Sequence, residues 1–266
     1  MQYIELYEAR VPVIGLGTWD LRGEICQRAV LSALNLGYRH IDTAQSYANE
    51  EEIGKALQSS PVPREEIFLT TKVWYTHLRY SEVIQALEES LRKLKTDYVD
   101  LYLIHWPSED VPLEETMSAM IKVKEEGKTR YIGVSNFDVP LLEKARQISP
   151  YPILTDQVEF HPYYSQRELL NYCQKNKVIL TAYSPLARRR LSDDLLLQEI
   201  GKKYGKTANQ VALRWLIQQE MVVAIPKAAS PEHQRENLDI FDFELTPEEM
   251  EKISRLDRRE KVASRI

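Results

Sequence analysis

Four ionisable side chains stand at or just after the ends of short apolar runs in the first part of the chain. The segment GYRHIDTAQSYANE, residues 37–50, ends an apolar run on Asp42 and then places Tyr47, while the next two runs end on Lys72 and His105. An unperturbed phenol has a pKa near ~10, so a tyrosine that donates a proton at neutral pH benefits from a nearby ammonium that favours the phenolate. A buried lysine needs a counter-ion in turn, and Asp42 is placed to be one. The group predicts a proton-transfer centre built on Tyr47.

Each of these residues also has a purely structural reading. Asp42 could cap a turn, Lys72 could extend its ammonium to the rim of the fold, and a single histidine such as His105 is common in protein cores. The structural reading weakens for the group as a whole, because independent caps and core residues have no reason to gather on one face.

Polar side chains also follow the other apolar runs. In chain order they are Thr18 and Trp19, Ser135 and Asn136, Gln157, Tyr183 and Ser184, and Lys227. In a barrel of parallel strands the working groups lie at the carboxyl ends of the strands. If the runs form such a barrel, all of these side chains are expected at one mouth of it.

Eight apolar runs alternate with segments of helical spacing. They cover residues 14–17, 38–42, 66–72, 98–105, 131–134, 153–158, 178–183 and 222–225. This alternation is typical of parallel strands joined by crossover helices, which form either a closed barrel or an open, doubly wound sheet. The open dinucleotide-binding sheet needs G-x-G-x-x-G after its first strand, whereas Gly15-Leu-Gly17 continues without a third glycine. The sequence therefore favours an α/β fold of the (β/α)8 TIM barrel type.

Phase and start signals support the helical segments. One helix face is expected to carry Ile25, Ala29, Val30 and Ala33, and another Ile84, Leu87, Leu91 and Leu94. Capping-box spacing joins Ser165 to Glu168, Thr207 to Gln210 and Thr246 to Glu249, and prolines follow Ser230 and Thr246. Segments 192–203 and 246–256 are expected as two helices additional to the eight, and YIELYEARVPV near the N-terminus as a hairpin closing one end of the barrel.

The composition limits the classes of function. With 266 residues, 43% of them hydrophobic and 28% charged, the chain is expected to form one domain over residues 1–266. A net charge of −5 argues against nucleic acid as a partner. Cys26 and Cys173 lie in helical patterns, which predicts reduced core thiols and a cytoplasmic location. No apolar run approaches the ~20 residues of a membrane span, so no membrane partner is expected.

Seven segments resemble, in order along the chain, the signatures of the aldo-keto reductase superfamily. They are residues 37–50, TTKVW at 70–74, LIHWP at 103–107, GVSNF at 133–137, QVEFHPY at 157–163, AYSPLA at 182–187 and IPKAASPEHQRENL at 225–238. The similarity spans essentially the whole chain and is greatest to the short members typified by 2,5-diketo-D-gluconate reductase and methylglyoxal reductases. It implies a (β/α)8 barrel that reduces aldehydes, dicarbonyls or keto-sugars to alcohols by hydride transfer, without a metal.

The resemblance also implies a role for each matching residue. Tyr47 would be the general acid of a catalytic tetrad completed by Asp42, Lys72 and His105. NADP(H) is the implied cofactor, with NAD(H) possible. Its contacts would include Thr18, with Ser135, Asn136, Gln157 and Tyr183 around the nicotinamide, Ser184 and Leu186 along the pyrophosphate, and Lys227, His233, Glu236 and Asn237 at the adenosine end. The substrate pocket would be walled by Trp19, Trp74 and Trp106, which could equally be core aromatics.

Two departures from the family pattern bear on the cofactor. Where the family usually has serine after the lysine of IPK and arginine in the following helix, this chain has Ala228 and His233. The preference for NADP(H) is therefore expected to be modest. The run of three arginines at 188–190 could restore positive charge near the pyrophosphate, or could be a solvated basic turn.

Two functions from other classes stay open on the residues alone. His40 and Asp42 at a strand end could belong to a metal-dependent barrel hydrolase, although the other histidines are not at ligand spacing. The same barrel could also serve as a non-catalytic, cofactor-sensing subunit, against which the complete tetrad argues. The short segment 254–266 is expected to leave the pocket open, which favours small carbonyl substrates, and we expect a monomer.

Overall fold

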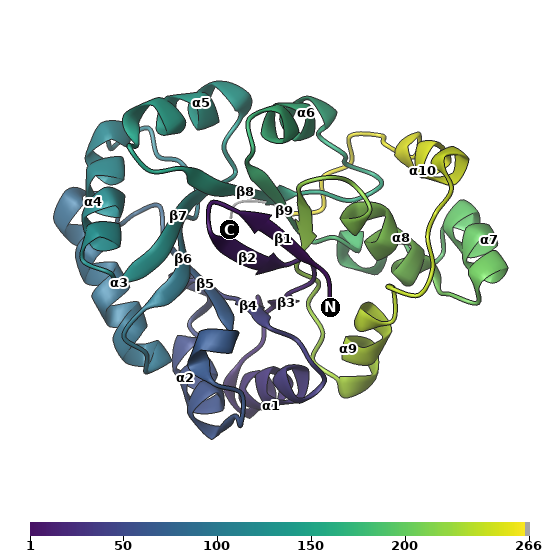
Figure 1. Ribbon diagram of the computed structural model, residues 1–266, viewed down its shortest axis with the longest axis horizontal. Coiled ribbons are helices and arrows are strands. Elements are labelled where there is room, and N and C mark those ends of the chain that lie inside the picture. The colour runs from purple at the N-terminus through teal and green to yellow at the C-terminus, as the bar shows by residue number, and fades with distance from the viewer. Residues whose placement is uncertain (264–266) are drawn as a thin grey trace.

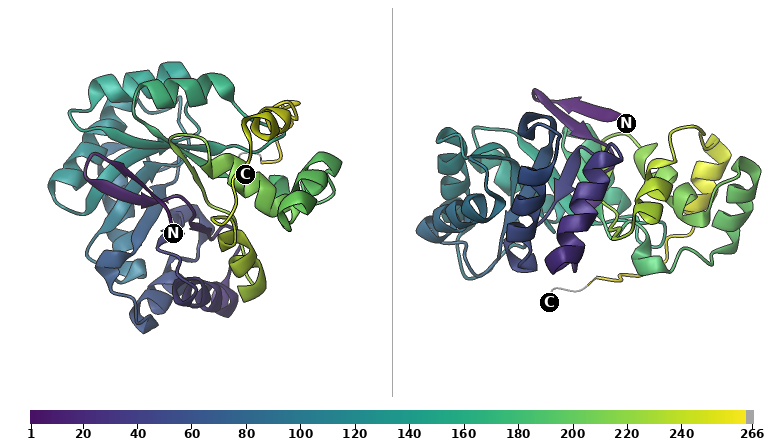
Figure 2. Two further views of the ribbon diagram at one scale, coloured as in Figure 1. Left: turned by 45° about the vertical axis from the view of Figure 1, so that its right-hand side comes forward. Right: turned by 90° about the horizontal axis from the view of Figure 1, so that it is seen from below.

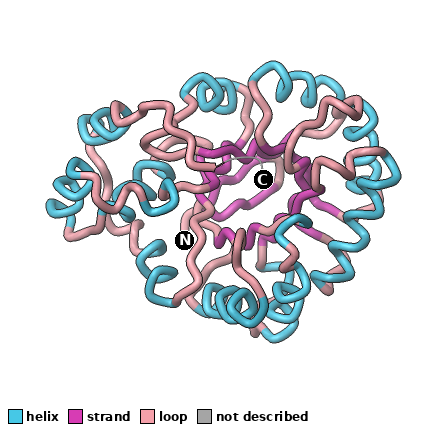
Figure 3. The backbone as a smooth tube through the Cα atoms, turned by 180° about the vertical axis from the view of Figure 1, so that it is seen from behind, coloured by secondary structure: helices cyan, strands magenta, loops and turns pink. Residues whose placement is uncertain are grey.

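The computed structural model describes residues 1–263 and places eight parallel strands in a curled sheet ringed by helices (Figure 1). The strands are β3 (Leu16–Gly17), β4 (His40–Asp42), β5 (Phe68–Val73), β6 (Val99–Ile104), β7 (Thr129–Ser135), β8 (Ile153–Glu159), β9 (Ile179–Tyr183) and β10 (Val222–Ala224). Neighbours in the sheet follow the order of the chain, and the parallel bridges Ile14–Ala224 and Gly17–Lys227 connect its first and last strands. Figure 3 shows the resulting ring of strands. The eight predicted β/α units are present, as a (β/α)8 fold requires.

Ten α-helices lie within residues 1–263. They are α1 (Gly23–Asn35), α2 (Glu50–Ser59), α3 (Tyr80–Leu94), α4 (Leu113–Glu125), α5 (Val139–Ile148), α6 (Arg167–Lys175), α7 (Leu195–Tyr204), α8 (Ala208–Ile217), α9 (Pro231–Leu238) and α10 (Pro247–Ser254). Short 3-10 turns are η1 (Gln45–Tyr47), η2 (Arg64–Glu66) and η3 (Ala187–Arg189). The helices α7 and α10 coincide with the two additional helices expected from the sequence, and none of the ten is long and apolar enough to span a membrane.

The predicted helix starts hold with one exception. Thr207 and Thr246 form complete capping boxes, and the Ser230 hydroxyl accepts a hydrogen bond from the backbone N–H of His233. The box predicted at Ser165 is wrong, because α6 begins only at Arg167, after Gln166 in the left-handed region with φ 34°. Ser165 instead donates its hydroxyl hydrogen to Asp257 Oδ2 at 2.7 Å, so a long-range partner replaces the local one.

The buried face of α1 differs from the prediction by one position. Ile25 is 54% exposed, whereas Cys26 is fully buried together with Ala29, Val30 and Ala33. A step of one residue turns a helix by about 100°, so Cys26 takes the inward position and Ile25 the outward one. Cys26 and Cys173 are both buried and free, as expected for core thiols.

The two mouths of the strand ring are covered by different segments. The N-terminal hairpin, β1 (Tyr3–Leu6) paired antiparallel with β2 (Ala9–Pro12), lies across one mouth, and the segment after α10 reaches the opposite mouth (Figure 2). Ala9 and Val11 of β2 share a buried apolar cluster with strand residues that include Phe68 and Leu101. Burial of these side chains ties the hairpin to the amino ends of the strands and leaves the carboxyl ends to carry polar groups.

Candidate active site

A buried ion pair links the ends of the neighbouring strands β4 and β5. Lys72 Nζ lies 2.6 Å from Asp42 Oδ1 and donates a second hydrogen bond to the backbone oxygen of Thr43 at 2.8 Å. The other carboxylate oxygen, Asp42 Oδ2, accepts a hydrogen bond from Gln157 Nε2 at 2.7 Å. Burial lowers the pKa of Lys72, and the charge of Asp42 opposes that shift. The counter-ion relation predicted from the sequence is thus present, with each charge held by further hydrogen bonds.

Tyr47 and His105 complete a compact group around this ion pair. The turn η1 brings the Tyr47 ring to 5.1 Å from Lys72 Nζ, measured to the ring centroid. The imidazole of His105 follows the end of β6 and meets the Tyr47 ring edge-on at a centroid distance of 5.6 Å. All four residues predicted as a tetrad are therefore neighbours, although they come from three β/α units: Asp42 and Tyr47 from that of β4, Lys72 from that of β5 and His105 from that of β6.

The electrostatic effect on Tyr47 differs from the prediction. Burial, followed by the charge of Asp42, raises the pKa of the Tyr47 phenol well above its usual value of 10. The lowering expected from Lys72 does not prevail, because burial and the charge of Asp42 both raise this pKa. Tyr47 is consequently fully protonated at neutral pH, which is the form that can donate a proton.

His105 is held as a neutral imidazole. Burial, and then the positive charge of Lys72, lower its pKa well below the ordinary value of 6.5. Its Nδ1 lies 3.4 Å from the hydroxyl oxygen of Ser46, a residue that the sequence reasoning did not select. A neutral imidazole keeps one N–H donor and one acceptor, so it can orient a carbonyl oxygen without competing as an acid.

A second polar group lies at the ends of β7, β8 and β9. Tyr183 donates its hydroxyl hydrogen to Asn136 Oδ1 at 2.8 Å, and Asn136 Nδ2 donates to Ser135 Oγ and to the backbone oxygen of His105, both at 3.0 Å. Ser135 in turn donates to the backbone oxygen of Gln157 at 2.7 Å. Since Gln157 also binds Asp42, one hydrogen-bond network joins these four residues to the tetrad.

The residues predicted along a pyrophosphate occupy an unusual stretch of backbone. Ser184, Ala187, Arg188 and Arg189 all have positive φ, between 47° and 75°, although none is glycine. Each such conformation costs roughly 1–2 kcal/mol, and Leu186 in their midst packs partly buried against the core. Thr18 is different: its hydroxyl is fully buried and donates to the backbone oxygen of Asp42 at 2.9 Å, so it fixes the strand end.

The residues predicted at the adenosine end form two separate pairs. The Lys227 side chain is 43% exposed, and its ammonium lies 3.8 Å from Asp20 Oδ2. On α9, His233 Nδ1 lies 3.4 Å from Glu236 Oε2, and the Thr207 hydroxyl donates to Glu236 Oε1 at 2.7 Å. The last of the predicted set, Asn237, is buried.

The three tryptophans have distinct surroundings. Trp74 meets His105 edge-on at a centroid distance of 5.0 Å, which places it beside the tetrad. Trp19 is 39% exposed, and the guanidinium of Arg188 lies over its ring at 4.8 Å. Trp106 is half-buried directly after His105. The arginine run does not act as one cluster, since Arg190 instead forms an ion pair with Glu260.

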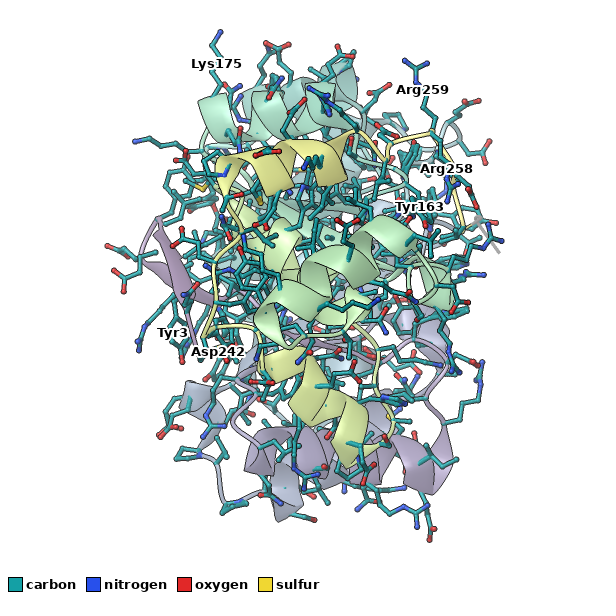
Figure 4. All side chains as sticks on the ribbon, turned by 90° about the vertical axis from the view of Figure 1, so that its right-hand side faces the viewer. Tyr3, Tyr163, Lys175, Asp242, Arg258 and Arg259 are labelled. Carbon is teal, nitrogen blue, oxygen red and sulfur yellow. The ribbon has the colours of Figure 1, made fainter. Side chains whose placement is uncertain are left out.

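The segment after α10 is fastened to the loop after β8. Arg258 lies over the ring of Tyr163, 3.6 Å from its centroid, and Figure 4 labels both residues. The buried carboxylate of Glu159 accepts hydrogen bonds from the backbone N–H groups of Val262 at 2.6 Å and Ala263 at 3.0 Å. The expectation of an open pocket also involved residues 264–266, which lie outside the described residues.

Comparison with known proteins identifies the group of enzymes to which this site belongs. The aldo/keto reductase family model matches residues 13–258. The chain belongs to this family. It is 44% identical to glyoxal reductase of Bacillus subtilis, over 95% of this chain and 91% of that protein. It is 40% identical to methylglyoxal reductase DkgA of Yersinia pestis, over 96% and 92%.

Solved structures agree with this aldo/keto reductase assignment. A protein described as 2,5-diketo-D-gluconic acid reductase B is 46% identical and superposes with a TM-score of 0.95, covering 97% of this chain and 92% of the other. A thermostable aldo-keto reductase in complex with the inhibitor epalrestat is also 46% identical, with a TM-score of 0.92 and coverages of 96% and 100%. This aldo/keto reductase is thus an oxidoreductase that reduces carbonyl groups.

Proposed function

We propose that this aldo/keto reductase uses NADPH to reduce small aldehydes and dicarbonyls, with Tyr47 as the proton donor. One observation carries the proposal: a protonated phenol lies against a fully buried ion pair, with a neutral imidazole beside it. Such an arrangement can give a proton to a carbonyl oxygen as negative charge develops there.

The side chains of the tetrad divide the work in this proposal. The Tyr47 hydroxyl donates its proton to the carbonyl oxygen, and the resulting phenolate is stabilised by the ammonium of Lys72 5.1 Å from the ring. Asp42 keeps that ammonium in place through the 2.6 Å contact. His105, which is neutral, orients the carbonyl oxygen toward Tyr47.

The network at the ends of β7 to β9 fits a nicotinamide. Amide and hydroxyl groups both donate and accept, as recognition of a carboxamide requires, and Asn136 and Tyr183 supply them at one place. When bound, the cofactor supplies the hydride for the carbonyl carbon. In the proposal Ser135, Asn136 and Gln157 hold the carboxamide, and the ring of Tyr183 offers a stacking surface.

The exposed ammonium of Lys227 supports NADPH as the preferred cofactor. A 2′-phosphate carries nearly two negative charges, and a charge-assisted hydrogen bond to lysine contributes about 1.5–3 kcal/mol. Its present neighbour Asp20 is 3.8 Å away, too far for a hydrogen bond, so the ammonium can reach a phosphate. The side chain of His233 is also exposed, near the start of α9.

Cofactor choice is tested by fluorescence titration of NADPH and NADH. NADPH is expected to bind about 10-fold more tightly or better at pH 7. Lys227→Ala should remove most of the preference with little change for NADH. Equal affinities in the unmodified enzyme, or a Lys227→Ala variant that still selects NADPH, would show that the phosphate is held elsewhere.

Half-exposed aromatic side chains support small substrates. Trp74 stands beside His105, and Trp19 is partly open to solvent, so an aromatic wall adjoins the tetrad without enclosing it. Methylglyoxal-like dicarbonyls and aromatic aldehydes are expected to have higher kcat/KM than bulky steroid ketones. A steroid preference across the same substrate panel contradicts the proposal.

The two other classes have less support. Within residues 1–263 no three histidine, cysteine or carboxylate side chains are grouped as a metal site needs, and a sensing subunit does not require the complete tetrad. Carbonyl reduction that persists after exhaustive chelation argues against the metal-dependent hydrolase. A turnover above about 0.1 per second argues against the non-catalytic sensing subunit. We extend the proposal to a cytoplasmic location, which the two free, buried thiols support. We also propose a monomer that folds as one domain over 1–266, and sedimentation measures its oligomeric state.

A further inference from the structure

Two polar residues directly after Tyr47 are almost completely buried. Asn49 is fully buried and Glu50 is only 2% exposed, where the chain passes from η1 into α2. Between them and Tyr47, Ala48 adopts the left-handed region with φ 52°. Burying an amide and a carboxyl group is costly unless each is hydrogen-bonded, so their partners show what the pair does.

Asn49 fastens the Tyr47 turn to the loops after β3 and β4. Its Oδ1 accepts the hydroxyl hydrogen of Thr43 at 2.8 Å, and its Nδ2 donates to the backbone oxygens of Thr18 at 2.8 Å and Leu21 at 3.0 Å. Thr43 directly follows Asp42, and its own backbone oxygen accepts from Lys72. One side chain thus connects the turn that carries Tyr47 to both members of the ion pair.

Glu50 fastens the same turn to the strand that carries Lys72. Its Oε1 accepts the hydroxyl hydrogen of Thr71 at 2.7 Å, and Thr71 is the residue before Lys72 on β5. One turn further along α2, a Cβ on Gly54 would lie only 2.3 Å from the backbone oxygen of Lys93 at the end of α3. Helix α2, which Figure 1 shows between α1 and α3, is therefore fixed at its start and along its length.

We infer that Asn49 and Glu50 are positioning residues, which hold the Tyr47 hydroxyl in place relative to Asp42 and Lys72 through Thr43 and Thr71. The inference rests on the proposed role of Tyr47 as proton donor. No hydrogen bond from Tyr47 itself to the ion pair exists in the described residues, so its position depends on the backbone that carries it. An error of about 1 Å at a reacting group can cost on the order of 100-fold in rate.

Threonine substitutions separate this role from ordinary packing. Thr43→Val and Thr71→Val keep the side-chain shape but remove the hydroxyl groups that bind Asn49 and Glu50. Thr43→Ser and Thr71→Ser keep the hydroxyl groups and lose a methyl group. Thr116→Val is a matched control, because Thr116 is equally buried and donates to the backbone oxygen of Leu78 at 2.8 Å, away from the tetrad.

The measurement is the single-turnover rate of NADPH oxidation with methylglyoxal, together with the NADPH Kd. Each valine variant at 43 or 71 is expected to slow this rate about 10-fold, and the double variant about 100-fold, with Kd changed less than about 2-fold. The serine variants and Thr116→Val should stay within about 2-fold of the unmodified enzyme.

Two results overturn the inference: valine variants that react at the original rate, or serine variants as slow as the valine ones. Failure of the proposed function looks different. If Tyr47 is not the proton donor, Tyr47→Phe retains its activity. If only the positioning role is wrong, Tyr47→Phe is inactive and the valine variants react at the original rate.

Discussion

The two mouths of the barrel both bury a carboxylate against cations, but they do so in different ways. At the carboxyl ends of the strands, Asp42 faces Lys72, and both side chains are almost wholly removed from water. Near the amino ends, Asp100 is equally buried but pairs with Arg64 at 2.9 Å and Arg130 at 3.1 Å, which are 20% and 46% exposed.

This difference separates a reactive site from a structural one. The arginines of Asp100 keep part of their hydration, and Leu69 donates its backbone N–H to the same carboxylate at 3.0 Å, so the group is fully satisfied. Lys72 has lost all contact with water, and the strained residues Ser184, Ala187, Arg188 and Arg189 lie at the same mouth. Complete desolvation of an ion pair is therefore found where the chemistry is proposed.

The largest expected effect is the loss of the Tyr47 hydroxyl. Tyr47→Phe keeps the ring that contacts His105 and removes the proton donor. General acid catalysis contributes about 100–10,000-fold to the rate. The rate of carbonyl reduction should therefore fall at least about 100-fold, while the affinity for NADPH stays close to normal. Steady-state assays and fluorescence titration measure the two quantities. Retention of more than about a tenth of the activity removes Tyr47 from the mechanism.

Asp100→Asn tests the opposite mouth. The substitution keeps the shape but leaves two arginines without their charged partner, and breaking a buried pair costs up to about 3–5 kcal/mol. We expect about 2–3 kcal/mol less stability in urea denaturation, since both arginines can turn toward water. The kcat should remain within about 2-fold of normal. A large fall in kcat would show that the two mouths are not independent.

Acid sensitivity is expected from His40, which lies inside the barrel below Asp42. Burial lowers its pKa from the ordinary 6.5 to about 4. Between these values the unfolded chain binds a proton that the folded chain does not, so stability falls as the pH is lowered from about 6.5 to about 4. The difference between the two pKa values corresponds to a loss of about 3 kcal/mol in the free energy of unfolding.

Urea denaturation at several pH values across this window measures the effect. The variant His40→Leu should show a flatter dependence on pH, with a remaining slope from His105, whose pKa is also lowered. An unchanged slope in His40→Leu would assign the acid sensitivity to other groups.

The smallest expected effect concerns Arg188 over Trp19. An exposed cation–π contact contributes about 0.5–1 kcal/mol, so Arg188→Gln should weaken NADPH binding about 2–5-fold if this contact holds the strained segment across the mouth. The NADPH affinity of Arg188→Lys should lie between those of the unmodified enzyme and Arg188→Gln, because an ammonium stacks less well than a guanidinium. Fluorescence titrations measure the NADPH affinity of the unmodified enzyme and of both variants. Identical affinities would show that the contact of Arg188 with Trp19 does not contribute to cofactor binding.

Much of the site could be predicted because, in a barrel of parallel strands, the place of a residue along its strand decides at which mouth it lies. Once eight strands run parallel, every residue that ends a strand lies at one mouth, which brought Asp42, Lys72 and His105 together. Periodicity and capping patterns are local, so Thr207 and Thr246 were predicted correctly. Ser165 was not, because Asp257, 92 residues away, competes for its hydroxyl.

What the sequence determined by itself was the order of elements and the chemical types at the strand ends, since both depend on neighbours within a few residues. Only the tertiary structure decided how those groups act on one another. The pKa of Tyr47 is raised rather than lowered, because burial dominates and the charge of Asp42, which lies 2.6 Å from Lys72, acts in the same direction. The buried partners of Asn49 and Glu50 are likewise invisible in the chain, because hydrogen bonds to Thr18 and Thr71 form only when separate loops and strands meet.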